Sequence, residues 1–98
     1  MKLLLICQGG ASTSILMNKM KKYAAGNGID LEVKATSITA YPDECAGFDV
    51  LLIGPQASYR RDEVARVSGK PTGAIAPVDY GIGNVESILK QADRLLGK

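Results

Sequence analysis

Histidine and tryptophan are absent from this sequence of 98 residues, and there are only two cysteines, Cys7 and Cys45. Without histidine, neither a Ser-His-Asp triad nor a Cys-His dyad can form within the chain. A zinc site needs about four ligands, and two cysteines without a CxxC motif do not supply them. We therefore expect no metal and no cofactor, and any histidine chemistry has to come from another protein.

Aromatic residues, clusters of basic residues and long apolar runs are also scarce. The chain has one Phe and four Tyr, and its net charge is +2 with dispersed Lys and Arg, so the sequence does not indicate nucleic-acid binding. No apolar run approaches the ~18 residues that span a bilayer, and the N-terminal segment lacks a signal-peptide pattern. We expect a cytoplasmic protein that does not insert into the membrane and, in that reducing compartment, no disulfide.

Strand and helix patterns alternate along one predicted domain, residues 1–98. The apolar runs 3–6 and 49–53 predict buried strands, the alternating segment 29–36 predicts an edge strand, and 72–76 predicts a short fourth strand. Helices are predicted from residue 12 or 13 to 25, from 57 or 58 to 67, and from 85 to 96 with Asn84 as its cap. Residues 41–46 suit a short helix or an irregular crossover, and residues 77–84 suit a loop.

Right-handed crossovers convert this order into an α/β fold, a four-stranded parallel sheet with strand order 2-1-3-4 and helices on both faces. In the middle helix, the predicted inward positions are Tyr59, Val64 and Val67. Ligands of such sheets bind at the carboxyl ends of the strands where the strand order reverses, here between strands 1 and 3. Cys7 ends the first strand and residues 54–56 follow the third, so we expect both at this edge.

A cysteine, two glycines and three hydroxyl residues follow the first strand. Gly9 and Gly10 allow backbone N–H groups to converge, and the helix that begins next adds unpaired N–H groups and positive dipole character. The same field would stabilise a Cys7 thiolate as a nucleophile, whereas a merely buried Cys7 is the alternative. Cys45 has no such surroundings and is interpreted as structural or incidental. The predicted phosphate-binding residues are Gln8, Gly9, Gly10, Ala11, Ser12, Thr13 and Ser14.

These motifs resemble the IIB component of the bacterial phosphoenolpyruvate-dependent sugar phosphotransferase system, of the lactose/cellobiose (chitobiose) type. Residues 7–14 (CQGGASTS), 52–56 (LIGPQ) and 79–81 (DYG) carry the resemblance, which covers essentially the whole chain. It implies a phosphoryl carrier in which Cys7 accepts the phosphoryl group from a phosphohistidine of the IIA component. The phosphocysteine would then pass the group to a sugar, of the cellobiose, lactose or chitobiose type, bound by the membrane IIC component.

Two positions depart from the family's pattern. Ala11 stands where Met is common, and Ala76 stands where relatives carry Asp, with Asp79 three residues later. We assign no catalytic role to Asp79. Gln56 and Tyr80 are candidate borders of the site, although packing explains either of them equally well.

Two other functions remain open from the residues. A cysteine phosphatase or arsenate-reductase-like enzyme would need an arginine six residues after the cysteine, at the position where Thr13 stands. A non-catalytic flavodoxin-like binding module would use Cys7 only for packing. Without the arginine and without an evident general acid, the site is expected to hydrolyse phosphate esters poorly, which suits a carrier.

Overall fold

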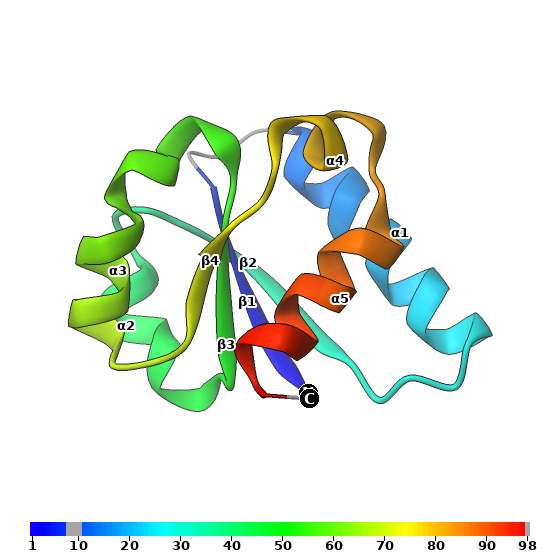
Figure 1. Cartoon of the computed structure of the whole chain (residues 1–98), viewed down its shortest axis with the longest axis horizontal. Helices are drawn as coiled ribbons and strands as arrows, with labels where there is room; N and C mark the ends of the chain where they lie inside the picture. Colours follow the sequence, from blue (N-terminus) through cyan, green and yellow to red (C-terminus); the bar gives the residue numbers. More distant parts are fainter. Residues whose placement is uncertain (8–10, 98) are drawn as a thin grey trace.

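The sheet consists of four parallel strands in the order β2-β1-β3-β4. The structure is a computed structural model, and it describes residues 1–7 and 11–97. β1 (Lys2–Cys7) lies between β2 (Glu32–Ser37) and β3 (Val50–Ile53), and β4 (Thr72–Ala74) pairs with β3 (Figure 1). The predicted fold class, strand order and edge position of the second strand are confirmed.

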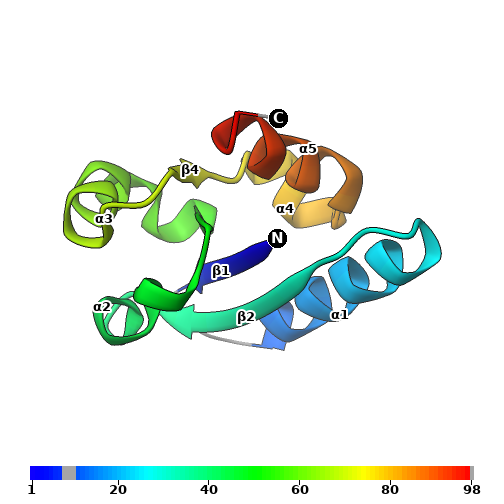
Figure 2. The ribbon, with the colours of Figure 1, turned by 90° about the horizontal axis from the view of Figure 1, so that it is seen from below.

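Helices cover both faces of this sheet, as Figure 2 shows in a view from below. α1 (Ala11–Gly26) and α5 (Val85–Leu95) lie on one face. On the other face lie α2 (Tyr41–Glu44), which continues into a 3₁₀ turn η1 (Cys45–Gly47), and α3 (Arg61–Ser68). The short α2 and η1 fit the short helix predicted for this crossover.

The alternation of side chains along β1 divides the core into two layers. Leu3, Leu5 and Cys7 pack on the side of α1 and α5, whereas Leu4 and Ile6 pack on the side of α2 and α3. All four residues from Leu3 to Ile6 have no exposed surface. The direction of Cys7 is therefore fixed by the strand that carries it.

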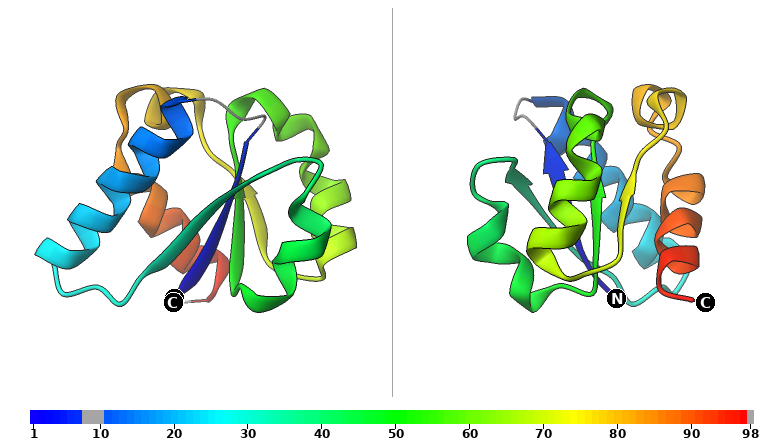
Figure 3. Two further views of the ribbon diagram at one scale, coloured as in Figure 1. Left: turned by 180° about the vertical axis from the view of Figure 1, so that it is seen from behind. Right: turned by 60° about the vertical axis from the view of Figure 1, so that its left-hand side comes forward.

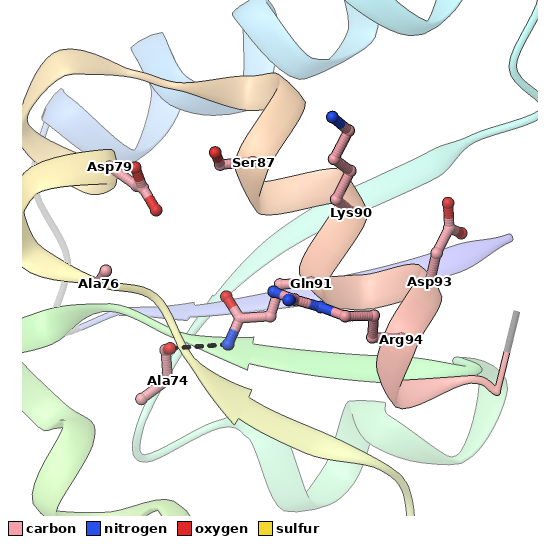
Figure 4. A pocket seen from close by; sticks show the side chains of 8 residues that line it. All are labelled: Ala74, Ala76, Asp79, Ser87, Lys90, Gln91, Asp93 and Arg94. Carbon is pink, nitrogen blue, oxygen red and sulfur yellow. Dashed lines mark hydrogen bonds between the residues drawn. The ribbon is translucent and has the colours of Figure 1, made fainter.

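The last helix is held closely against β4. Asn84 accepts a hydrogen bond from the backbone N–H of Ser87 at 3.3 Å, which confirms the predicted cap. A Cβ atom at Gly73 would lie 2.8 Å from Leu95 Cδ1 and 2.9 Å from Gln91 Nε2, so a larger residue here would require the ends of these two side chains to shift. Gln91 Nε2 also donates a hydrogen bond of 2.8 Å to the carbonyl of Ala74 (Figure 4).

The prediction of a loop over residues 77–84 is wrong, because this segment contains a helix, α4 (Pro77–Ile82). Proline at the first helical position has a φ that suits helix initiation, and its missing N–H needs no partner there. Gly83 ends the helix with a φ of 67°, a left-handed conformation that favours glycine. Only the flanks of α4 signal a helix, since its sequence has no apolar periodicity.

The predicted helix over residues 57–67 is also different at its start. It begins as a 3₁₀ helix, η2 (Pro55–Arg60), and becomes α3 only at Arg61. A 3₁₀ helix has three residues per turn, so α-helical spacing does not give the direction of its side chains. Tyr59 is 78% exposed and Val67 at the end of α3 is 51% exposed, contrary to the prediction, whereas Val64 is fully buried.

Element bounds shift at three further places. α1 starts at Ala11 rather than at residue 12 or 13, and β2 starts at Glu32 rather than at residue 29. The segment before β2 stays outside the sheet because the backbone N–H of Ile29 bonds to Ala24 at the end of α1. β4 ends at Ala74, two residues earlier than predicted.

Both ends of the described chain lie at the end of the sheet opposite to the carboxyl ends of the strands (Figure 3). The N-terminal ammonium donates a hydrogen bond of 2.8 Å to the carbonyl of Asp30. Among the described residues, no helix is long and apolar enough to cross a bilayer. Because both ends of the described chain lie at the opposite end of the sheet, neither lies at the edge that carries Cys7.

An ion pair ties α2 to the edge strand and makes stability depend on pH. Glu44 lies 2.5 Å from Lys34 Nζ and accepts a hydrogen bond from Thr36 Oγ1. The hydrogen bonds from Lys34 and Thr36 lower the pKa of Glu44 below its usual 4.5. The folded protein therefore binds fewer protons than the unfolded chain, and this stabilisation is present above pH 4.5 and is lost as the pH falls through the lowered value.

We predict that Glu44→Gln lowers the thermal unfolding midpoint at neutral pH and that the difference from wild type is smaller at about pH 3, because the lowered pKa of Glu44 makes the stabilisation fade as the pH falls below 4.5. Thermal scans at both pH values test this. Asp62→Asn serves as control, because the Asp62 side chain is 95% exposed and pairs only with the adjacent Arg61 in the described structure. Equal midpoints of Glu44→Gln and wild type at neutral pH would contradict the prediction.

Candidate functional site

Cys7 is the last residue of β1, at the carboxyl edge of the sheet. Ile6 pairs with Ile53, and the N–H of Gly54 donates a hydrogen bond of 2.8 Å to the carbonyl of Ile6. The thiol of Cys7 is free and its residue is 2% exposed. The first and third strands thus bring Cys7 and Gly54 side by side, as the predicted strand order requires.

The space around the thiol is filled from three segments. A Cβ atom built at Gly54 would lie 3.1 Å from Cys7 Sγ, 3.3 Å from Gln56 Oε1 and 3.6 Å from Tyr80 Cε2. The φ and ψ of Gly54, −63° and 157°, are open to any residue, so it is the limited space, and not the backbone conformation, that favours glycine here. The structure therefore brings Gln56 and Tyr80, the two predicted border residues, together with Cys7.

Tyr80 makes a direct polar contact with the thiol. Its Oη lies 3.7 Å from Cys7 Sγ, a distance at which either atom can donate. Tyr80 is carried by α4, the helix that the sequence analysis missed, and its N–H bonds to the carbonyl of Ala76 at 3.0 Å. Proline at residue 77 and glycine at residue 83 were the signals that could have revealed this helix.

The start of α1 contributes a favourable field at the same edge of the sheet (Figure 1). Its first turn contains no acidic residue, so no carboxylate opposes an anion at the positive end of the helix dipole. Ser14 is exposed on this helix. Of the other predicted phosphate-binding residues, Gln8, Gly9 and Gly10 lie outside the described residues, as do the side chains of 11–13, so the cradle stays a prediction.

Two hollows lie near this edge, and they are lined differently. One, of about 190 Å³, adjoins the site because Tyr80 lines it together with Ile15 and Lys19 of α1. The other, of about 630 Å³, lies over β4 and α5 and is lined by side chains of both charges (Figure 4). Asp79 lines this second hollow, which Cys7 does not reach, and its Oδ1 accepts a hydrogen bond of 3.4 Å from Asn84.

Cys45 lies in a different environment from Cys7. It belongs to the core layer on the side of α2 and α3, whereas Cys7 belongs to the layer on the side of α1 and α5. Its Sγ donates to the carbonyl of Pro42 at 3.6 Å, and the residue is 6% exposed. This placement agrees with a structural role. Within residues 1–7 and 11–97, no three His, Cys, Asp or Glu side chains are grouped to hold a metal ion.

Comparison with known proteins supplies the context for this site. The family model of the lactose/cellobiose-specific IIB subunit of the phosphotransferase system matches residues 2–91. The chain belongs to this family. The protein is therefore a IIB subunit, a phosphotransferase that acts in the phosphoryl relay of sugar uptake, and Cys7 lies at the carboxyl end of its strand β1.

Individual relatives match this sequence over nearly the whole chain. The cellobiose-specific EIIB component of Lactococcus lactis subsp. lactis is 39% identical, with 94% of this chain and 93% of the relative covered. The galactose-specific EIIB component of L. lactis subsp. cremoris has the same identity and coverage. The solution structure of a cellobiose-specific IIB component from Borrelia burgdorferi superimposes with a TM-score of 0.81 at 30% identity, covering 99% of this chain and 92% of that one. IIB subunits of this family work with IIA and IIC components.

We predict that Gly54→Ala slows phosphorylation of the protein, but by less than the roughly 100-fold that a displacement of about 1 Å costs, because the neighbours of the added Cβ need to move by only a few tenths of an ångström. The added methyl group would meet Cys7 Sγ at 3.1 Å and force the thiol or its neighbours to move. Gly47→Ala is the matched control, since a Cβ there has no atom within 4 Å. Phosphorylation rates and thermal midpoints of both variants test this, and a Gly54→Ala variant as fast as Gly47→Ala would overturn it.

Proposed function

We propose that Cys7 is the phosphoryl acceptor of this IIB subunit. The observation that carries the proposal is the position of its thiol, at the carboxyl end of the central strand and at the edge where α1 begins. The thiolate would attack the phosphorus of a phosphohistidine on the IIA component. The S–P bond forms as the N–P bond breaks, and the imidazole nitrogen keeps the electron pair of the broken bond. The histidine missing from this chain is then supplied by the donor.

The phosphocysteine would next donate its phosphoryl group to a sugar hydroxyl on the IIC component, and the thiolate would leave. The first turn of α1, without acidic residues, favours the phosphoryl charge, and residues 8–14 are proposed to supply the backbone N–H groups around it. Thr13 stands where a cysteine phosphatase would carry arginine, so no guanidinium group at this position would bind the phosphoryl group. A carrier benefits from this weaker hold because the group must leave again.

The sugar is proposed at the level of the family, a cellobiose-, lactose- or chitobiose-type carbohydrate. Relatives of equal identity are named for cellobiose and for galactose, so overall similarity does not distinguish the sugar. We also propose that the chain works in the cytoplasm, with the sugar recognised by the membrane component. The phosphatase and the binding-module alternatives gain no support from the family match.

We predict that incubation with phosphoenolpyruvate, enzyme I, HPr and a cognate IIA adds the mass of one phosphoryl group to the intact protein. Peptide mapping should place it on Cys7, and omission of IIA should abolish it. Cys7→Ser should gain no phosphoryl group, whereas Cys45→Ser should behave as wild type because Cys45 lies in the other core layer.

Modification of another residue, or full phosphorylation of Cys7→Ser, would show that Cys7 is not the acceptor. No added mass with a IIA that phosphorylates a different IIB subunit would exclude that IIA pathway for this chain. Turnover of a simple phosphomonoester at an appreciable rate would favour the phosphatase alternative.

A further inference from the structure

A thiolate at Cys7 needs hydrogen-bond donors, because the residue is almost entirely removed from water. Burial disfavours an anion unless polar groups replace the lost solvent. Histidine, the usual partner of a nucleophilic cysteine, is absent from the chain. The Tyr80 hydroxyl lies 3.7 Å from Sγ in a direct polar contact, and Gln56 Oε1 lies, like Sγ, beside the position of Gly54.

We propose that Tyr80 is a catalytic residue of this carrier, and that its hydroxyl donates a hydrogen bond to the Cys7 thiolate in the unphosphorylated state. A thiolate can only accept, so the direction of the bond is fixed once the thiol loses its proton. The tyrosine keeps its own proton throughout. When the S–P bond replaces the negative charge on sulfur, the same O–H group is placed to donate to a phosphoryl oxygen. The proposal rests on Cys7 being the acceptor.

The position of Tyr80 is fixed by the short helix around it. Pro77 begins α4, the N–H of Gly83 bonds back to the carbonyl of Tyr80 at 3.3 Å, and the N–H of Asn84 bonds to the carbonyl of Asp79 at 2.8 Å. The ring packs beside Gly54, where Cε2 lies 3.6 Å from a hypothetical Cβ. The hydroxyl is thus presented to the sulfur by a folded scaffold and needs little ordering when the thiolate forms.

Charged groups on the neighbouring described elements have other contacts. Asp79 on α4 bonds to Asn84 and lines the hollow over α5. Lys19 on α1 lies against Gly83 and lines the smaller hollow together with Tyr80. On the side of β2, Glu44 is paired with Lys34, and on η2 Arg60 is paired with Glu63. We therefore expect that removal of the contact between the Tyr80 hydroxyl and Cys7 Sγ changes the stability of the thiolate most.

The experiment is the pH profile of iodoacetamide alkylation at Cys7, followed by mass spectrometry of its peptide in wild type and Tyr80→Phe. Loss of a hydrogen bond to the anion should move the midpoint of the profile upward by about one pH unit. A more basic thiolate is also more nucleophilic, with a Brønsted coefficient of about 0.4–0.5. The variant should therefore react about threefold more slowly than wild type below the midpoint and about threefold faster on the plateau above it.

This crossing of the two profiles is a signature that a change of exposure does not produce, because greater access raises the rate at every pH. Tyr59→Phe is the matched control, since Tyr59 is 78% exposed on η2, and it should reproduce the wild-type profile. Cys45, buried in the other core layer, reports within the same sample whether either substitution loosens the fold. Thermal midpoints of the two variants complete that check.

A Tyr80→Phe profile with an unchanged midpoint, or one raised uniformly at all pH values, would overturn the proposal. The titration uses no donor protein, so its outcome is independent of the phosphorylation assay. If Cys7 fails to accept a phosphoryl group while the profiles cross, the proposed function fails and the hydrogen bond stands. If Cys7 is phosphorylated and the profiles coincide, the proposed role of Tyr80 fails alone.

Discussion

The pairing of β1 with both of its neighbours is the constraint on which the rest of the structure depends. β1 exchanges backbone hydrogen bonds with β2 on one side and with β3 on the other, so its register and the direction of each side chain are fixed. A slip by one residue would turn Cys7 toward the layer of α2 and α3, away from Tyr80. The location of the thiol beside Gly54 follows from this register rather than from the loop after β1.

Much of this arrangement could be predicted because it depends on local sequence patterns. The continuous apolar runs of β1 and β3 and the alternation in β2 indicate which strands are central and which lies at an edge, and right-handed crossovers then give the sheet order. The spacing of α5 and its Asn84 cap are equally local. Gln56 and Tyr80 were placed near the site because each follows a strand that ends at the same edge.

The errors arose where tertiary contacts or backbone geometry override the pattern. α4 has little apolar periodicity, and it is defined by its two ends and by packing beside Gly54. In η2, the tighter 3₁₀ geometry turns Tyr59 outward, so spacing derived from an α-helix gives the wrong face. The preference for glycine at residue 54 was also missed, because only the folded molecule shows that a thiol, an amide and an aromatic ring converge on its missing side chain.

The two outer strands differ in how they deter association with strands of other molecules. β4 has only three residues, and the side chain of Gln91 already occupies the carbonyl of Ala74. β2 is longer, and it carries the exposed charged residues Glu32 and Lys34. Short length and charge are both known to discourage edge-to-edge pairing and aggregation. The sheet is therefore terminated at both sides, and a strand from another molecule would have to break an existing bond or bury a charge in order to extend it.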